Sequence, residues 1–407
     1  MLMLAPQHPQ LRDSDALPPH RGSVRYGPEL RVLIVGGGVA GLTLAALLEQ
    51  RGFTPTVVEK GSNAPDRCYT IGLWPAGSRI LKGLRLYSRF CDLGVECSRY
   101  IVSNEHGDTL RSFSFEPLRR RFGAMIELGS LELIELLRSA VQERHIRYGA
   151  TVREIAETPE GVVAVFDDDT ARLFDVVVGC DGIHSSVRQL VFGDEAVEPS
   201  GIVGWASWLP PDFVPPPEIV EYWGAGRFVG MYPTRRRFCA VLARQAPTGE
   251  PDPVETRVER ARAAFRGFGG IVPWVLSELP APEEMRPLEF SDVRLERWTQ
   301  GRVVLIGDAA HAIAPTAGMG ASLAMESAAV LADELCRTDS KFLMPMLEQF
   351  VARRRPRIDR IQSQSRRLAR LTFAGGGLMT RLRDRAVRII ADEPVLEHVE
   401  DMLAERI

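Results

Sequence analysis

The sequence lacks several features that would each point to a particular class of protein. Its six cysteines form no C-x-x-C pair and show no spacing typical of a zinc site or a disulfide framework. We therefore expect free thiols in a reducing cytoplasm and predict no metal site. No apolar run reaches the roughly 18 residues of a membrane-spanning helix, and the N-terminal segment lacks the basic start of a secretory signal.

An excess of charge of one sign is also absent. The 50 basic and 53 acidic side chains leave a net charge of only −3, so the chain as a whole shows no preference for nucleic acid or for an anionic membrane. Residues 1–29 are rich in proline and polar side chains, which predicts a flexible tail. The oligomeric state is left open by the sequence.

A glycine-rich loop follows the first apolar run, at residues 31–35, which is typical of a strand buried on both faces. Gly36, Gly38 and Gly41 form G-x-G-x-x-G, and a helical pattern at residues 42–51 follows. In a βαβ unit the first glycine permits the turn, the second admits a pyrophosphate close to the backbone, and the third lets the helix pack. Val39 and Ala40 complete the loop, whose helix N-terminus favours phosphate.

An acidic residue ends the second predicted strand, at residues 56–58. Glu59 lies 23 residues after Gly36, close to the spacing of an acid that binds a ribose 2′-hydroxyl. A 2′-phosphate would be repelled by this carboxylate, so the motif favours FAD or NAD over NADP. Lys60 follows directly.

A second loop, "GDAAHAIAPTAGMGAS", runs from Gly307 to Ser322 after a predicted strand at residues 303–306. The carboxylate of Asp308 is suited to hydroxyl groups, and Pro315 stiffens the loop. The backbone of Gly318, Met319, Gly320 and Ala321 begins the next predicted helix, where free N–H groups stabilise negative charge. Between the two loops, residues 175–178 predict a strand that ends in the turn Asp181-Gly182, with Ser185 or Ser186 as helix N-cap.

The three motifs together resemble single-component FAD-dependent monooxygenases of the p-hydroxybenzoate hydroxylase type, over residues 30–390. The resemblance implies one extended FAD, with its ADP half on the first loop and its ribityl chain at Asp308. It also places the flavin pyrimidine edge against residues 318–321, and Asp181 and Gly182 near the pyrophosphate. The residues assigned to the cofactor are Gly36, Gly38, Val39, Ala40, Gly41, Glu59, Lys60, Asp181, Gly182, Gly307, Asp308, Gly318, Met319, Gly320 and Ala321.

The implied fold class is α/β, α+β overall, in which a Rossmann-like FAD-binding domain is interleaved with an antiparallel-sheet substrate domain and followed by C-terminal helices. The predicted bounds are 30–195 for the first part of the FAD domain, with a substrate-domain excursion at about 75–120, 196–290 for the substrate sheet, 291–345 for the second part, and 346–407 for the C-terminal helices.

The implied activity uses NADPH or NADH and O₂ to hydroxylate or epoxidise an aromatic or unsaturated small molecule through a flavin C4a-hydroperoxide. Pro315 is expected to shape the reaction site. His311 is either a catalytic base or a histidine that packs within its motif. A flavin-dependent reductase or dehydrogenase is an alternative, and so is a halogenase, although Trp205, Trp208 and Pro210 depart from the W-x-W-x-I-P spacing of that class.

Substrate contacts are expected from residues 196–290, between the Asp181-Gly182 turn and the Gly307-Asp308 motif, and from the segment that follows the second predicted strand. The candidates, for each of which core packing is the alternative, are Trp74, Trp205, Tyr222, Met231, Tyr232 and Pro233. Arg235, Arg236 and Arg237 are expected to form an exposed hairpin turn.

Two features do not fit the resemblance simply. The family often has an arginine that contacts the cofactor where this sequence has Ser130 or, in another register, Leu128. Ser130 is a candidate helix cap, and one of Arg119, Arg120 or Arg121 is the candidate replacement for the missing charge. Residues 351–390 hold twelve arginines and two acids, which predicts helices that cover the FAD domain or, alternatively, a surface for a membrane or a partner.

Overall fold

The computed structural model describes residues 26–62, 69–193, 197–210, 216–390, 399–400 and 402–403. The predicted tail, residues 1–29, lies outside these ranges except for its last four residues. Of those, Gly27–Glu29 form a 3-10 helix, and the Gly27 amide donates a hydrogen bond of 3.1 Å to the Thr338 carbonyl. This end of the predicted tail is therefore ordered against the body of the protein.

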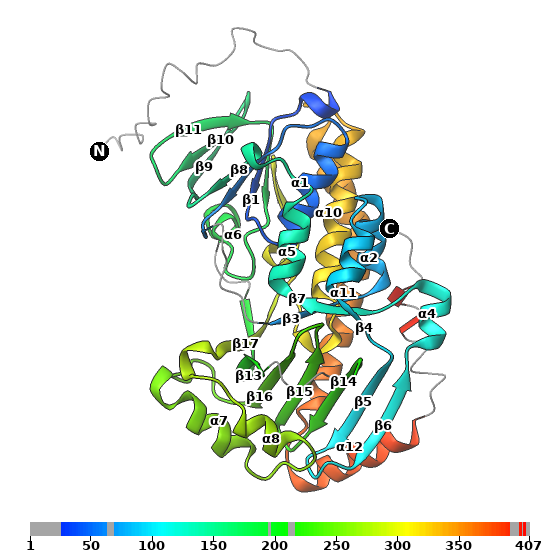
Figure 1. Cartoon of the computed structure of the whole chain (residues 1–407). Helices are drawn as coiled ribbons and strands as arrows, with labels where there is room; N and C mark the ends of the chain where they lie inside the picture. The colour runs from blue at the N-terminus through cyan, green and yellow to red at the C-terminus, as the bar shows by residue number, and fades with distance from the viewer. Residues whose placement is uncertain are drawn as a thin grey trace, which may run out of the picture.

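The upper part of the molecule in Figure 1 contains a six-stranded, mostly parallel sheet with the strand order β18-β19-β12-β1-β2-β8. Its strands are β1 (Val32–Val35), β2 (Thr56–Glu59), β8 (Ile146–Tyr148), β12 (Val176–Gly179), β18 (Thr299–Gln300) and β19 (Val303–Leu305). All four residues of β1 and of β12 are buried. Continuous apolar runs of this kind are typical of parallel strands covered on both faces.

The lower part of Figure 1 contains a seven-stranded sheet, which is antiparallel except where β14 pairs with β5. In sheet order its strands are β17 (Arg286–Val293), β13 (Val197–Trp208), β16 (Phe238–Gln245), β15 (Arg227–Pro233), β14 (Glu218–Trp223), β5 (Arg99–Asn104) and β6 (Thr109–Ser114). The predicted turn at Arg235, Arg236 and Arg237 is exposed and joins β15 to β16. Together with the first sheet, this sheet confirms the predicted fold class.

Two small sheets complete the strands. The sheet β3-β7-β4 lies between the two large ones in Figure 1 and consists of β3 (Thr70–Leu73), β7 (Ile126–Gly129) and β4 (Val95–Glu96). The other consists of β9 (Val152–Thr158), β10 (Gly161–Phe166) and β11 (Ala171–Phe174). The first of these places β7 between the two halves of the molecule, and this position matters for the site.

The helices cover and connect the sheets. They are α1 (Val39–Gln50), α2 (Pro75–Gly83), α3 (Tyr87–Leu93), α4 (Glu116–Phe122), α5 (Ser130–Arg138), α6 (Ser186–Phe192), α7 (Arg257–Phe265), α8 (Val272–Ser277), α9 (Asp308–His311), α10 (Gly320–Cys336), α11 (Leu343–Thr372) and α12 (Gly377–Ile389). None of those within the described part of the chain is long and apolar enough to cross a membrane.

The long helix α11 belongs to both halves of the molecule. Its first turns bury Leu347 and Phe350 in the core of the six-stranded sheet, and its end buries Ala369 against the seven-stranded sheet. A buried ion-pair cluster fixes it to α10, since both Arg354 and Arg357 contact the fully buried Glu326, at 2.9 and 2.7 Å. This helix therefore holds the two sheets in a fixed relation.

Candidate active site

The three sequence motifs meet at one edge of the six-stranded sheet because their strands are neighbours. β1 pairs in parallel with β12, and β12 pairs in parallel with β19. Gly36, Asp181 and Gly307 follow these strands within two residues of their ends, so all three turns lie at the carboxyl edge. Ligands of open parallel sheets bind at this edge.

The glycines of the first loop have two different functions. A Cβ atom on Gly36, whose φ is +110°, would lie 2.4 Å from the Cys180 carbonyl oxygen, and one on Gly41 would lie 2.0 Å from the Gly36 carbonyl oxygen. These two glycines permit close backbone packing. A Cβ atom on Gly38 would meet nothing within 4 Å, and Gly38 lines the cavity described below. The space above Gly38 at the N-terminus of α1 fits a pyrophosphate.

Glu59 organises the loop at the end of β2. Its two carboxylate oxygens accept hydrogen bonds of 2.7 Å from the amides of Gly37 and Gly61. Glu59 and the following Lys60 both line the cavity. The position at the carboxyl edge, beside the glycine loop, fits the predicted contact of Glu59 with a ribose hydroxyl.

Asp181 fixes the start of α6. Its carboxylate accepts hydrogen bonds from the hydroxyls of Ser185 and Ser186 and from the Val187 amide, at 3.0 Å for the amide. The Ser185 hydroxyl in turn accepts from the Arg188 amide at 3.0 Å and is the N-cap of α6. Both Asp181 and Gly182 line the cavity.

One cavity of about 520 Å³ connects these motifs with the seven-stranded sheet. From the late loop it is lined by Asp308, Pro315, Gly318, Gly320 and Ala321. Gly41, Gly307 and Met319 do not line it: Met319 is fully buried, and Gly307 packs against Ala40, since an added Cβ atom would lie 2.9 Å from the Ala40 Cβ. These three residues pack against the protein side of the two loops, away from the cavity.

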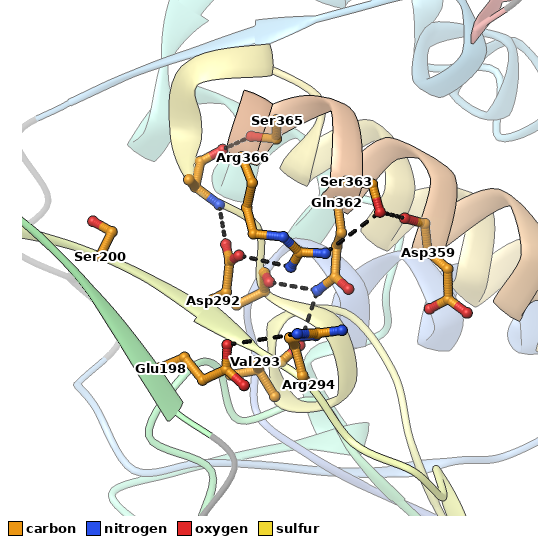
Figure 2. Close-up of polar contacts among 12 residues, drawn as sticks. Glu198, Ser200, Asp292, Val293, Arg294, Asp359, Gln362, Ser363, Ser365 and Arg366 are labelled. Atoms are coloured by element: carbon orange, nitrogen blue, oxygen red, sulfur yellow. Dashed lines mark hydrogen bonds and ion pairs between the residues drawn. The ribbon is translucent and has the colours of Figure 1, made fainter. Parts of the chain in front are cut away.

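The late loop is attached to α11 by the polar network that Figure 2 shows. The Asp292 carboxylate accepts hydrogen bonds from the Ala314 amide at 2.7 Å and from Arg366 at 2.9 Å. The Gln362 side chain donates to the carbonyls of Val293 and Ala312, both at 2.9 Å. The conformation just before Pro315 is therefore set by contacts to α11 and β17.

His311 does not reach the cavity. It is 3% exposed, its Nε2 atom lies 3.1 Å from the Ser327 hydroxyl, and its ring packs against Trp298. Burial, together with the charge of Arg354, lowers the pKa of His311 to about 3. Of the two interpretations of this residue, its position favours packing within the motif over catalysis.

The face of the seven-stranded sheet decides which predicted substrate residues line the cavity. Successive residues of a strand point to opposite faces. Tyr232 lines the cavity, whereas Met231, Tyr222 and Trp205 pack on the other face in the cluster that contains α7 and α8. Those three positions are therefore corrected from substrate contacts to core, and the Trp205 indole donates a hydrogen bond of 3.0 Å to Asp252.

Two further candidates, Trp74 and Pro233, are not among the residues that line the cavity. The Trp74 ring packs edge-on against Phe115, and its Nε1 atom would lie 3.6 Å from a Cβ atom on Gly318. Trp74 therefore supports the late loop from outside the cavity. Pro233 is buried and follows Tyr232, so it is on the opposite side of its strand.

Several cavity residues were not anticipated. Apolar ones from β15, β16, β17 and the C-terminal end of α11 include Phe228, Val241, Leu288, Phe290, Leu368 and Phe373. The polar ones include Tyr100, Glu127 and Glu221. Each of these two acids interrupts an apolar strand, and acids are almost never buried without a partner, so this pattern was a signal that sequence reading missed.

Glu221 is the centre of a hydrogen-bond network on the cavity wall. Its carboxylate accepts from the Tyr100 hydroxyl, from the Trp223 indole at 2.9 Å and from the Tyr232 hydroxyl at 3.2 Å. Burial raises the pKa of Glu221, and these three donors oppose the rise. Burial and the neighbouring carboxylate also raise the pKa of both tyrosines well above the usual value.

The structure offers no replacement for the missing arginine from α4. Arg119 pairs with Glu96, Arg120 with Glu116 and Arg121 with Glu400, and all three arginines are exposed and outside the cavity lining. Ser130 is the first residue of α5 and not its cap, and among the described residues its hydroxyl has no hydrogen-bond partner.

Comparisons with known proteins agree with this geometry. The family model described as "FAD binding domain" matches residues 29–365. The chain is 31% identical over 396 residues to the 3-amino-4-hydroxybenzoate 2-monooxygenase PtnB3 of Streptomyces platensis, covering 91% of this chain and 94% of that one. It is 29% identical over 364 residues to the 2-heptyl-3-hydroxy-4(1H)-quinolone synthase of Pseudomonas aeruginosa, covering 89% and 94%.

The fold is shared with solved structures as well. Klebsiella pneumoniae HpxO, solved with FAD and uric acid, superposes with a TM-score of 0.86 at 24% identity over 93% of this chain and 98% of that one. None of these similarities favours the reductase or halogenase alternatives. The space above Gly38 is open, and the three motifs meet at one sheet edge, as FAD binding requires. Together with the family match, this shows that the chain belongs to the family of FAD-dependent monooxygenases with this FAD-binding domain.

Proposed function

We propose that this protein uses NADPH or NADH and O₂ to hydroxylate a small aromatic molecule held between the late loop and the seven-stranded sheet. The observation that carries the proposal is the cavity of about 520 Å³, which joins the three FAD motifs to a wall of aromatic and aliphatic side chains. When bound, FAD supplies the chemistry of hydride acceptance and oxygen activation, while the protein positions and shields the reactants.

Different residues of the chain would bind the cofactor, stabilise charge on its ring and exclude water. Gly38 and the N-terminus of α1 would hold the pyrophosphate, and Asp308 would bind the ribityl hydroxyls; the open space at Gly38 and the position of both residues on the cavity wall support these roles. The N-terminus of α10 at Gly320 favours negative charge on the ring edge that faces it. Phe290 and Phe373, which pack edge-on at 6.1 Å between ring centroids, help to exclude water from the reaction side.

The test is an assay of NADPH and NADH oxidation with oxygen uptake and peroxide measured together. A useful probe pair is 3-amino-4-hydroxybenzoate, named for a relative, and 2-aminophenol, the same ring without its carboxylate. We expect at least one aromatic probe to stimulate oxidation without a matching yield of peroxide. Anaerobic turnover onto an organic acceptor, or protein that cannot be reconstituted with FAD, would contradict the proposal.

The proposal extends to the cellular location. Cys91, Cys97, Cys180, Cys239 and Cys336 are free thiols, which supports a reducing cytoplasm.

We further propose that α12 rests on an anionic lipid surface. This helix buries Thr380, Arg383 and Val387 on one face and exposes Leu378, Leu382 and Ile389 on another. Its exposed arginines are Arg381, Arg385 and Arg388. An exposed apolar stripe beside basic side chains is typical of a helix that lies in a membrane interface, and the positive charge suits anionic head groups.

A further inference from the structure

Glu127 is a buried acid that the proposed chemistry has not used. It lies in β7, between Gly72 of β3 and Val95 of β4, and it lines the cavity. The residue is 3% exposed, and its Oε2 atom has no hydrogen-bond partner among the described residues. Buried polar atoms are nearly always hydrogen-bonded, so an exception on a cavity wall calls for a missing partner.

The surrounding backbone leaves room for this carboxyl group. A Cβ atom on Gly72 would lie 2.5 Å from the Glu127 Oε1 atom, so only glycine fits there without displacing the acid. Burial raises the pKa of Glu127 to about 8, although a hydrogen bond with Thr70 acts in the opposite direction. Burial therefore disfavours the ionised form of Glu127. A hydrogen-bond donor that enters the cavity would reduce this desolvation cost.

A second buried acid of the same cavity, Glu221, differs from Glu127 in its hydrogen bonds. Glu221 accepts three hydrogen bonds, from Tyr100, Trp223 and Tyr232. The charge of Glu127 also contributes to the raised pKa of Tyr232, the tyrosine that donates a hydrogen bond to Glu221. Glu221 thus has its donors within the protein, whereas the buried Oε2 atom of Glu127 has none among the described residues.

The basic side chains that line the cavity lie at its ADP end, beside the first loop and the Asp181-Gly182 turn. Among the described residues that line it, the basic ones are Lys60 and His184, which follow Glu59 and the Asp181-Gly182 turn at the ADP motifs. The substrate wall instead carries Glu127, Glu221 and Glu289. A carboxylate placed there would lose its water without a compensating cation, and it would further oppose ionisation of the buried acids Glu127 and Glu221, which is unfavourable.

We propose that Glu127 binds an N–H or O–H donor of an uncharged aromatic substrate, and that this end of the cavity, where no basic side chain is among the described lining residues, rejects substrates that carry a carboxylate. This proposal rests on the proposed function, because it specifies the substrate class of the same cavity. It sets the chain apart from a relative whose name specifies a benzoate, despite their 31% identity. Aminophenols and hydroxylated or N–H heteroaromatic rings without an acid group have the required chemistry.

The test is equilibrium binding of the probe pair to the FAD-loaded protein, by calorimetry and in the absence of NADPH and NADH. We expect the wild type to bind 2-aminophenol at least about tenfold more tightly than 3-amino-4-hydroxybenzoate, the ratio that roughly 1.4 kcal/mol provides. In Glu127→Gln the ratio should fall toward one, and Glu127→Asp should restore part of it. Glu289→Gln is the matched control and should leave the ratio unchanged, because Glu289 lines the same cavity but is exposed to solvent, unlike the buried Glu127.

Three results would overturn the proposal: no saturable binding of 2-aminophenol, tighter binding of the carboxylated probe by the wild type, or an unchanged ratio in Glu127→Gln. FAD content and melting temperature identify a variant that has lost its fold. If Glu127→Gln is lost in this way, Glu127→Asp gives the answer, because it should keep part of the preference for 2-aminophenol. Failure of the proposed function is seen separately. It leaves the binding ratio intact but gives no oxygen uptake with any aromatic probe.

Discussion

The Ser365 hydroxyl donates a hydrogen bond of 2.6 Å to the Ala314 carbonyl, and this contact ties α11 to the residue that precedes Pro315. The Thr316 hydroxyl returns a hydrogen bond of 2.9 Å to the Ser365 carbonyl. Figure 2 shows that Asp292 and Arg366 act on the same short segment. The position of the late loop therefore depends on a helix about fifty residues further along the chain, where no cofactor motif exists.

Replacing Ser365 tests this dependence. We expect Ser365→Ala to lower the free energy of unfolding by about 1–2 kcal/mol, because it removes a buried hydrogen bond and leaves the Ala314 carbonyl short of a donor. FAD affinity should fall several-fold, since the loop that faces the ring is less well held. Chemical denaturation and flavin fluorescence titration measure the two effects. Ser363→Ala is the control, because Ser363 is on the same helix but is bonded to the Asp359 carbonyl. Equal effects of the two changes would contradict the prediction.

The two glycine classes of the first loop should respond oppositely to a side chain. Gly38 has an extended backbone and nothing within 4 Å of an added Cβ atom. Gly38→Val should therefore keep the stability of the FAD-free protein and lose FAD. Gly41→Ala should destabilise the FAD-free protein itself, because its Cβ atom would lie 2.0 Å from the Gly36 carbonyl oxygen. Melting temperature and bound flavin separate the cases, and loss of fold in Gly38→Val would argue against the assigned roles.

His311 should make the protein sensitive to acid. Its pKa is about 3 in the fold and about 6.5 in an unfolded chain. Between these values the unfolded state binds more protons, so stability falls as the pH falls, by at most about 1.4 kcal/mol per unit. Unfolding measured from pH 7 to pH 4 should show a flatter dependence in His311→Gln than in the wild type. His106→Gln, which changes an exposed histidine, is the matched control. Substrate turnover near neutral pH should survive His311→Gln if its role is packing.

The surface of α12 is tested with lipid vesicles. We expect the protein to sediment with phosphatidylglycerol vesicles, to remain free of phosphatidylcholine vesicles, and to be released by high salt, because screening weakens the contribution of the arginines. Leu378→Ser combined with Leu382→Ser should abolish binding without altering FAD content. Leu190→Ser, on α6, removes an exposed leucine elsewhere and serves as control. Equal binding to phosphatidylglycerol and phosphatidylcholine vesicles would contradict the proposed role of the arginines.

The sequence brought together the residues of the proposed cofactor end because the motifs that define it are local. A strand, a glycine turn and a helix N-terminus form one continuous segment, so the residues of each motif are placed by their own neighbours along the chain. Gly38, Glu59, Asp181 and Asp308 all line the cavity as a consequence. The fold class followed from the same motifs, since they require parallel strands whose carboxyl ends share an edge.

The substrate end was predicted poorly because the seven-stranded sheet is covered on both faces. α7 and α8 bury one face, while α11 and the cavity cover the other, so residues of both faces are apolar and period-two alternation carries no signal. Tyr232 and Met231 are equally good candidates in sequence, yet only Tyr232 lines the cavity.

The amino-acid sequence by itself determined the family, the cofactor and the three turns that we propose hold it, because glycine conformation and carboxylate chemistry act over a few bonds. Only the tertiary structure decided which acids face the substrate. Glu127 and Glu221 come from strands almost a hundred residues apart, and β7 and β14 bring them to one cavity through pairings with other strands. Burial, which turns an ordinary glutamate into a selective group, is a property of that packing and of no single segment.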